Sequence, residues 1–559
     1  NKFFNLFINP GGGNTVNAGS LLDVDGELEV TSGTLAMAGQ SADVAGITDI
    51  DGILSMTNGT FTSASSGSSE IAGTLTIGAG TYNANGNLNS PGTITFTDAG
   101  TLNLKSASPT ITTFNSATST VRFIKDATNQ SIPQVTYFNV EIGGLGGNKN
   151  AGGTLNITND LTISSSSLVM STHNLILTRN FLLTNGVFDA GTGSHDIDGN
   201  LTLNGGTFTA SSSTLDLAGN WDDVLGAFDG GTGTITLSGG ATKTIKTGAS
   251  NKFNNLTIDG TIETFSDFDI EIGGVLDVNE SKTLTIVVGD QLTFTGTGSA
   301  HTIVGTLTMN TSAGSNSILD FTGSTLNTVV VDGTLNLNGT DATGQALVTG
   351  DANSTVNLSF PNGASGTGAG KFNGNFFTIS FPDATGVKIT NATEPAMANG
   401  IFQNPTAGGI LLNLNDATNL PQTLQNLTFN GNPGAGINVS ANASTNPAVT
   451  FVNYSGTLAD DATVAEANDS DNGDPGDKLI WFDNVWYSYR FAFPKNCDNL
   501  GSWYSLPNNS SALKPADLGI TDFSDINSEW IVDNTGSAHT YTAAANWSPA
   551  GKVTIKSGS

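Results

Sequence analysis

A short phrase that recurs along the chain limits the fold more than any other feature. Residues 26–35, 52–61, 73–82 and 199–208 follow the pattern Gly-x-apolar-x-apolar-x-x-Gly-Thr-apolar, and weaker copies begin at Arg179, Gly274, Gly305 and Gly333. Apolar and polar residues alternate within each copy, which predicts a β-strand with one buried face. The first three copies start 26 and 21 residues apart. This spacing suits a coil of two or three short strands joined by bends at Gly or Asn.

A single coil of this kind cannot bury its own inward side chains, so neighbouring coils must stack and share backbone hydrogen bonds. We therefore expect an all-β protein, a parallel β-helix (β-solenoid) followed by a small Trp-rich β module. The usual preference of parallel crossovers makes a right-handed coil the expectation.

Composition divides the chain into three parts. Residues 1–457 are expected to form the parallel β-helix of imperfect 20–26-residue coils, and 458–480 an acidic loop and the last coil or junction. Residues 481–559 are expected to form a small aromatic-rich β module that leads into a further repeat module, because five of the six Trp residues lie beyond Asp460.

Charge and hydropathy exclude two classes of partner. The chain has 48 acidic against 18 basic residues, a net charge of −30, and such a surface repels nucleic acid and anionic membranes. No apolar run approaches the ~20 residues that a membrane span requires, so we expect no membrane insertion in this segment. The single cysteine, Cys497, cannot form a disulfide within the chain.

Three stretches resemble the β-helix regions of large surface proteins of Bacteroidota: residues 252–258 (KFNNLTI), 199–221 and 451–456 (FVNYSG). The resemblance covers roughly residues 1 to 480. It implies export by the type IX secretion route, a secreted or bacterial cell-surface location, and an adhesin-like or structural role. Residues 545–555 look like the lead-in to another β-helical module, so we expect the segment to belong to a longer polypeptide.

Parallel β-helices also support polysaccharide lyases and hydrolases, which makes catalysis an alternative to weigh. The most enzyme-like cluster is His195, Asp196 and Asp198, since a His beside carboxylates can relay a proton or bind a metal. However, Asp-x-Asp-Gly recurs at residues 23–26 and 49–52, just before the repeated phrase. Recurrence at equivalent places predicts a turn, and we predict no catalytic residues.

Two clusters near the end of the chain could bind a ligand. Asp469, Asp471 and Asp474 partly resemble an oxygen-rich Ca²⁺ loop, although Ile480 stands where an EF-hand would have its last Glu. Ca²⁺ is therefore a candidate cofactor, and a solvated acidic loop is the alternative. An aromatic cluster suits either a sugar-stacking platform or, more simply, a small-domain core; it comprises Trp481, Trp486, Tyr487, Tyr489, Trp503 and Tyr504.

These features favour a structural or adhesive extracellular surface protein whose solenoid is a rigid stalk or scaffold. Its expected partners are surface glycans or other cell-surface proteins. Two alternatives stay open: a self-assembling subunit of an extracellular filament or sheath, which would use exposed strand edges, and a carbohydrate-active β-helix enzyme, for which the sequence offers an analogy of fold but no site.

Overall fold

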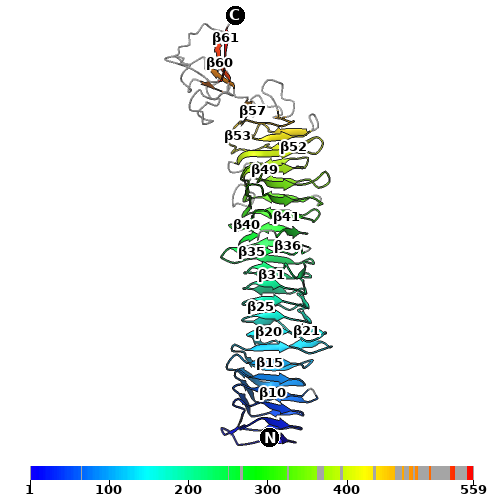
Figure 1. Cartoon of the computed structure of the whole chain (residues 1–559). Helices are drawn as coiled ribbons and strands as arrows, with labels where there is room; N and C mark the ends of the chain where they lie inside the picture. Colours follow the sequence, from blue (N-terminus) through cyan, green and yellow to red (C-terminus); the bar gives the residue numbers. More distant parts are fainter. Residues whose placement is uncertain are drawn as a thin grey trace, which may run out of the picture. The chain divides into compact units, whose positions relative to one another are not determined.

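The computed structural model describes residues 2–64, 66–249, 251–264, 268–323, 327–361, 370–390, 395–431, 436–459, 469–470, 478–482, 485–488, 503–504, 529–534 and 551–557. The regular elements in these ranges are all β-strands (Figure 1). Contacts between residues divide the chain into unit 1, Asn1–Asn336, and unit 2, Leu337–Ser559. In the described ranges no helix is long and apolar enough to cross a membrane.

Unit 1 is a stack of three-sided coils (Figure 1, blue to green). In one representative coil, β25 (Leu175–Leu177), β26 (Phe181–Leu183) and β27 (Val187–Asp189) form the three sides. Each strand pairs in parallel with its equivalent in the next coil, so that Phe181 faces Leu201 and Val187 faces Thr207. The repeated phrase therefore supplies two sides of each coil, and the prediction of parallel stacked coils is confirmed.

The first side of unit 1 is a ladder in which, among the described residues, sixteen strands follow one another in parallel. They are β1 (Lys2–Phe3), β4 (Leu22–Val24), β7 (Ala42–Val44), β10 (Thr60–Ser63), β13 (Thr81–Ala84), β15 (Thr101–Leu104), β17 (Thr120–Phe123), β20 (Asn139–Ile142), β23 (Leu161–Ile163), β26, β29 (Leu201–Leu203), β32 (Trp221–Asp222), β35 (Lys243–Lys246), β37 (Thr261–Thr264), β40 (Thr283–Ile286) and β43 (Thr306–Asn310). At about 4.8 Å between paired strands, this ladder is about 70 Å long.

The other sides of unit 1 are shorter ladders. Near the N-terminus they comprise β2 (Leu6–Ile8), β5 (Leu28–Val30), β8 (Thr48–Ile50) and β11 (Ser68–Ile71), and β3 (Thr15–Asn17), β6 (Thr34–Ala36), β9 (Ile53–Met56) and β12 (Thr74–Ile77). The long strand β14 (Asn87–Phe96) joins both rows and pairs with β16 (Thr110–Asn115).

Further along unit 1, one side contains β18 (Gln130–Ile132), β21 (Asn148–Ala151), β24 (Ser167–Val169), β27, β30 (Thr207–Thr209) and β33 (Ala227–Asp229). Another contains β19 (Thr136–Tyr137), β22 (Leu155–Ile157), β25, β28 (Ser194–Ile197), β31 (Thr214–Leu217), β34 (Thr234–Leu237), β36 (Asn255–Ile258), β39 (Leu276–Val278), β42 (Ala300–Ile303) and β45 (Thr328–Val331). A short row of β38 (Ile270–Ile272), β41 (Gln291–Phe294) and β44 (Ser317–Asp320) completes the unit.

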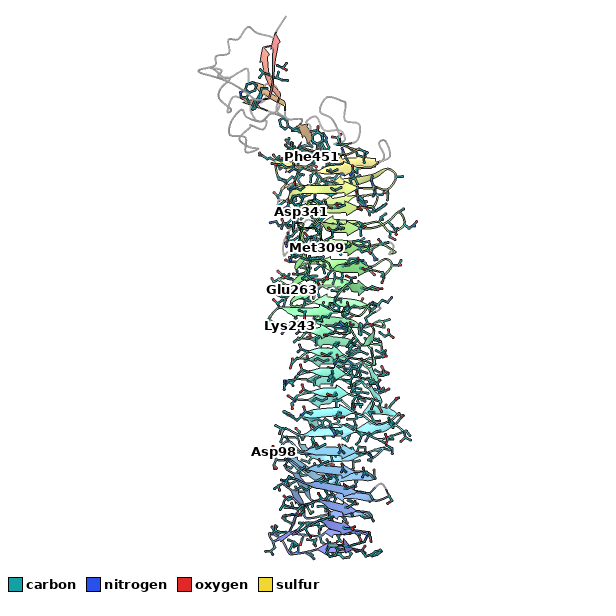
Figure 2. All side chains as sticks on the ribbon, in the orientation of Figure 1. Asp98, Lys243, Glu263, Met309, Asp341 and Phe451 are labelled. Carbon is teal, nitrogen blue, oxygen red and sulfur yellow. The ribbon has the colours of Figure 1, made fainter. Side chains whose placement is uncertain are left out.

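The core of unit 1 is the inside of the coils, where the alternating apolar residues point. Leu28 and Val30 of one coil and Leu201 and Leu203 of another are fully buried, and each such side chain contributes about 1.5–3 kcal/mol. Phenylalanines pack against equivalent rings of neighbouring coils, for example Phe188 against Phe208 in a tilted arrangement with centroids 4.8 Å apart. Side chains fill and surround the coils along the whole unit (Figure 2). Each coil is therefore stabilised mainly by its two neighbours.

Glycines occupy bends where the backbones of successive coils approach closely. A Cβ added to Gly46 would lie 2.2 Å from the carbonyl oxygen of Gly26, and one added to Gly67 would lie 1.9 Å from that of Gly46. Because no real Cβ contact is that short, only glycine allows the coils to stack at these bends.

Unit 2 begins within β46 (Thr334–Asn338) and continues with wider coils. One row contains β47 (Ala346–Thr349), β49 (Lys371–Ser380), β51 (Ala396–Gln403), β53 (Thr423–Gln425), β54 (Thr428–Asn430), β56 (Val449–Val452) and β57 (Leu479–Phe482), and another β48 (Asn357–Phe360), β50 (Val387–Ile389), β52 (Gly409–Asn413) and β55 (Gly436–Ser440). Because β57 pairs with β56, the coil runs on to Phe482, and the Trp481 ring stacks on Phe451 at 4.5 Å.

Beyond this coil, four strands form a separate small sheet: β58 (Val485–Ser488), β59 (Trp503–Tyr504), β60 (Glu529–Asn534) and β61 (Lys552–Ser557). Strands β58 and β59 are antiparallel, whereas β60 pairs in parallel with both β58 and β61. Trp503 and Trp530 are fully buried and pack edge to face, with centroids 5.2 Å apart. These two rings therefore form part of a core.

Candidate functional site

The cluster of His195, Asp196 and Asp198 does not converge on one point. His195 is buried in the core, in register with Leu175 and Leu215, whereas Asp196 and Asp198 are exposed on the outside of the coil. The His195 Nδ1 accepts the backbone N–H of Leu175 at 3.1 Å, and Nε2 lies 2.9 Å from the carbonyl oxygen of Ala190. His195 therefore acts as a polar core residue that is satisfied as the neutral tautomer with a proton on Nε2.

His301 occupies an equivalent place several coils later. Its Nδ1 accepts the backbone N–H of Leu276 at 3.0 Å, and its ring packs on Phe294 with centroids 4.1 Å apart. Burial disfavours the charged imidazolium, and it lowers the pKa of His301 to about 4 and also lowers the pKa of His195. Both rings are therefore neutral hydrogen-bond acceptors inside the solenoid.

The predicted Ca²⁺ residues are only partly within the described residues. Asp469 Oδ2 accepts a hydrogen bond from the Trp481 indole Nε1 at 2.8 Å. Asp471 and Asp474 lie outside the described residues, so Ca²⁺ binding here stays a prediction. Among the described residues no group of three or more His, Cys, Asp or Glu side chains is arranged to hold a metal ion.

A ladder of Asp and Asn side chains follows one edge of the coils in unit 1. The Oδ1 atoms of Asp160, Asn180, Asn200 and Asn220 each accept the backbone N–H of the equivalent residue one coil on, at 2.9–3.1 Å. The sequence signal was available, because these residues recur every 20 positions immediately before Leu, Phe or Trp. The ladder satisfies bend amides that the strands do not pair, and its role is structural.

A groove of about 760 Å³ lies on unit 2, across β49, β51 and β53. Its polar lining includes Lys371, Thr423 and Gln425 and a row of three asparagines, Asn375, Asn399 and Asn426. Its apolar lining includes Pro395, Ala396, Met397, Pro421 and Leu424. Met397 and Leu424 are buried beneath the surface, whereas Ala396 and Pro421 remain accessible.

The three asparagines of the groove form a continuous row from coil to coil. Asn399 Nδ2 donates to Asn375 Oδ1 at 2.9 Å, and Asn426 Nδ2 donates to Asn399 Oδ1 at 2.9 Å. Asn399 and Asn426 have φ values of 53° and 56°, in the left-handed region that Asn tolerates better than most residues. This backbone turns both amides into the row. Each amide keeps at least one further N–H and at least one further lone pair beyond those used in the row.

The charge of the groove is unusual for this chain. Of the described residues that line it, Lys371 alone is charged, and none is Asp or Glu, although the chain contains 48 acidic residues. General acid–base catalysis requires a titratable group near the substrate, and Lys371 is the one such group in the part of the lining that the structure describes. The arrangement is suited to binding through hydrogen bonds.

No pattern in the sequence predicts this groove. Its lining comes from three segments, residues 371–375, 395–399 and 421–426, in the region where the repeated phrase loosens. The spacing of Asn375, Asn399 and Asn426, 24 and 27 residues apart, is too irregular to reveal a row without the structure.

No protein-family model, curated protein or solved structure matches this chain significantly.

Proposed function

We propose that the chain is a structural and adhesive extracellular surface protein in which the solenoid of unit 1 is a rigid scaffold. The observation that supports this most strongly is the parallel ladder from β1 to β43, in which each step is backed by buried apolar side chains. Bending or stretching such a ladder breaks backbone hydrogen bonds and exposes core at the same time. A spacer that holds a binding surface away from a cell needs this property.

Surface charge also supports an extracellular scaffold. The outer faces of adjacent coils align like charges, as in the row of Glu29, Asp49 and Glu70 on β5, β8 and β11. A net charge of −30 opposes association between copies through self-repulsion. The cell-surface location and the type IX export route form part of the proposal, and the resemblance to Bacteroidota surface proteins motivates them.

The experiment is to label intact cells of the source organism with an antibody raised against unit 1. We expect labelling without permeabilisation, and loss of the labelled band after a protease is added outside the cells. A cytosolic protein probed in the same samples is the control for cell integrity. Labelling that requires permeabilisation would contradict the proposal.

A further inference from the structure

We infer that the groove on unit 2 binds an uncharged polysaccharide strand along its row of asparagines. The inference rests on the proposed adhesive function and names the chemical class of the ligand. The observation behind it is a continuous amide row beside accessible apolar surface, in a concavity whose described lining residues include no carboxylate.

The charge of the groove favours an uncharged ligand. A cationic ligand finds no carboxylate among the described lining residues. An anionic polymer finds one cation, Lys371, among the described lining residues, and it must approach a chain that carries a net charge of −30. That field lowers the rate of approach and the affinity of anions at low ionic strength. A ligand without charge meets neither obstacle.

The hydrogen-bonding capacity of the row matches hydroxyl groups. An amide offers both a donor and an acceptor to the ligand, and a sugar hydroxyl likewise donates and accepts. Thr423 and Gln425 add a hydroxyl and another amide beside the row. Ala396 and Pro421 present C–H surface, which suits the apolar face of a pyranose ring.

The spacing of the row distinguishes a glycan from a peptide. The three asparagines lie on successive coils, and paired strands of successive coils are about 4.8 Å apart. Groups on one side of an extended peptide recur only every ~6.6 Å, because alternate residues point to opposite sides. The rise of one pyranose ring in an extended glycan is close to the coil spacing, so successive sugars can meet successive amides.

The test uses the full chain and measures binding to immobilised neutral polysaccharides, namely dextran, galactomannan and arabinoxylan, by biolayer interferometry. Polygalacturonate and an uncharged Gly-Ser peptide are included as probes of the competing ligand classes. We expect binding to at least one neutral polysaccharide, with an affinity that changes little between low and high salt.

The variant Asn399→Gly/Asn426→Gly removes both amides but keeps the left-handed backbone, which glycine adopts freely. We expect this variant to bind about tenfold more weakly, as the loss of a pair of hydrogen bonds would cause. Asn404→Gly is the matched control, because Asn404 also has a left-handed φ of 56° and does not line this groove. It should leave the affinity unchanged, and the melting temperatures of all three proteins are compared.

Three results would overturn the inference: no binding to any neutral polysaccharide, equal weakening by the double variant and by Asn404→Gly, or salt-sensitive binding to polygalacturonate alone. The inference and the proposed function can fail separately. Surface labelling without polysaccharide binding would contradict the proposed ligand and leave the proposed scaffold function standing. Polysaccharide binding by a protein confined to the cell interior would support the ligand and contradict the extracellular function.

Discussion

Individual polar residues inside unit 1 show how a solenoid tolerates hydrogen-bonding groups in its core. His301 is fully buried, yet its Nδ1 accepts a backbone N–H from the preceding coil. The interaction requires a neutral ring, because a protonated imidazole has no acceptor. Folding and the charge state of this one side chain are therefore coupled.

We predict that His301 makes the solenoid sensitive to acid. Its pKa is about 4 in the folded chain, against 6.5 for an exposed imidazole. As the pH is lowered, the unfolded state binds the proton near pH 6.5, whereas the folded state binds it only near pH 4. His301 therefore contributes stability above pH 6.5, and up to about 3 kcal/mol of this stability is lost as the pH falls towards 4. Thermal unfolding of wild type and His301→Leu between pH 4 and pH 7.5 measures this.

Leucine suits this position because Leu276 and Val329 occupy equivalent core positions in the neighbouring coils. Two effects oppose each other in this variant at pH 7: the Leu276 N–H loses its acceptor, but the buried His301 Nε2, which has no hydrogen-bond partner among the described residues, is removed. We therefore expect a change in stability of less than about 2 kcal/mol at pH 7, and a shallower acid dependence. Buried Asp223, whose pKa is raised to about 6 mainly by burial, acts in the opposite direction in both proteins. Parallel pH profiles for the two proteins would exclude the role of His301. His173→Gln, in a half-buried turn, serves as the control.

A second prediction concerns the glycine bends. Gly67→Ala would bring a Cβ within 1.9 Å of the Gly46 carbonyl oxygen, so the coils must separate locally, at a cost of about 1–3 kcal/mol. Gly240→Ala is the matched control, because nothing lies within 4 Å of its Cβ position. Urea unfolding of the two variants compares them, and a similar midpoint for both would show that close stacking does not constrain these bends.

The alternation of apolar and polar residues predicts which face of a strand each side chain occupies. Applied to the His195 cluster, it already indicates that these side chains do not share a face. His195 is two residues before Ile197, so the same alternation that buries Ile197 also buries His195 and exposes Asp196. Residues that are adjacent in the sequence of a strand point to opposite faces, so they cannot form one site. The row formed by the asparagines of the groove was not predictable in this way. Asn399 and Asn426 lie at bends with a left-handed backbone, and no local sequence pattern predicts those bends.

The coil is the element of this fold, and its length is fixed by register. In the middle of unit 1 equivalent residues are 20 apart, as in the pairing of Phe181 with Leu201. Each coil ends with the same bend residue, because Asn180 and Asn200 both precede the first strand of a new turn. One coil can therefore replace another at the same bend.

We predict that deletion of residues 181–200 leaves a folded solenoid. Removal of this whole coil joins Asn180 to Leu201, which then takes the place of Phe181 in the ladder, and Leu175 meets Leu215 in place of His195. Nearest-neighbour stabilisation is preserved. Circular dichroism and thermal unfolding should show a cooperative transition with slightly reduced enthalpy.

The comparison for this deletion is removal of residues 181–190 alone. Deletion of half a coil places the remaining strands on the wrong sides of the solenoid, so their apolar side chains no longer pack in the core. We expect this protein to aggregate or to show no cooperative unfolding transition. If both deletions behaved alike, coil register would not govern stability. The length of a coil was predictable from the repeated phrase. The phrase left two or three strands per coil open, and the strand pairing shows three.

For the whole molecule, the net charge is an unfavourable contribution to folding. The chain has a net charge of −30, and the carboxylates of Glu29, Asp49 and Glu70 lie on adjacent strands. The pKa of Asp49 is raised by burial and then by Asp51 and Glu70. Ion pairs such as Arg122 with Glu141, at 2.8 Å, are few among the described residues.

We therefore predict that salt stabilises the protein at pH 7. Raising NaCl from about 0.01 M to 0.5 M shortens the Debye length from about 30 Å to below 8 Å and screens repulsion between carboxylates. The melting temperature should rise by several degrees. Asp49→Asn should raise it at low salt and reduce the gain from added salt. A melting temperature that falls as salt is added would show that ion pairs outweigh repulsion.

The glycine bends and the shared coil period also have a genetic consequence. Because coil ends are interchangeable and each coil depends on its two neighbours, duplication of about twenty codons lengthens unit 1 by one strand spacing, about 4.8 Å. Such a duplication needs no compensating change elsewhere in the core. If unit 1 serves as the proposed scaffold, its reach would change in uniform small increments, one for each coil gained by duplication.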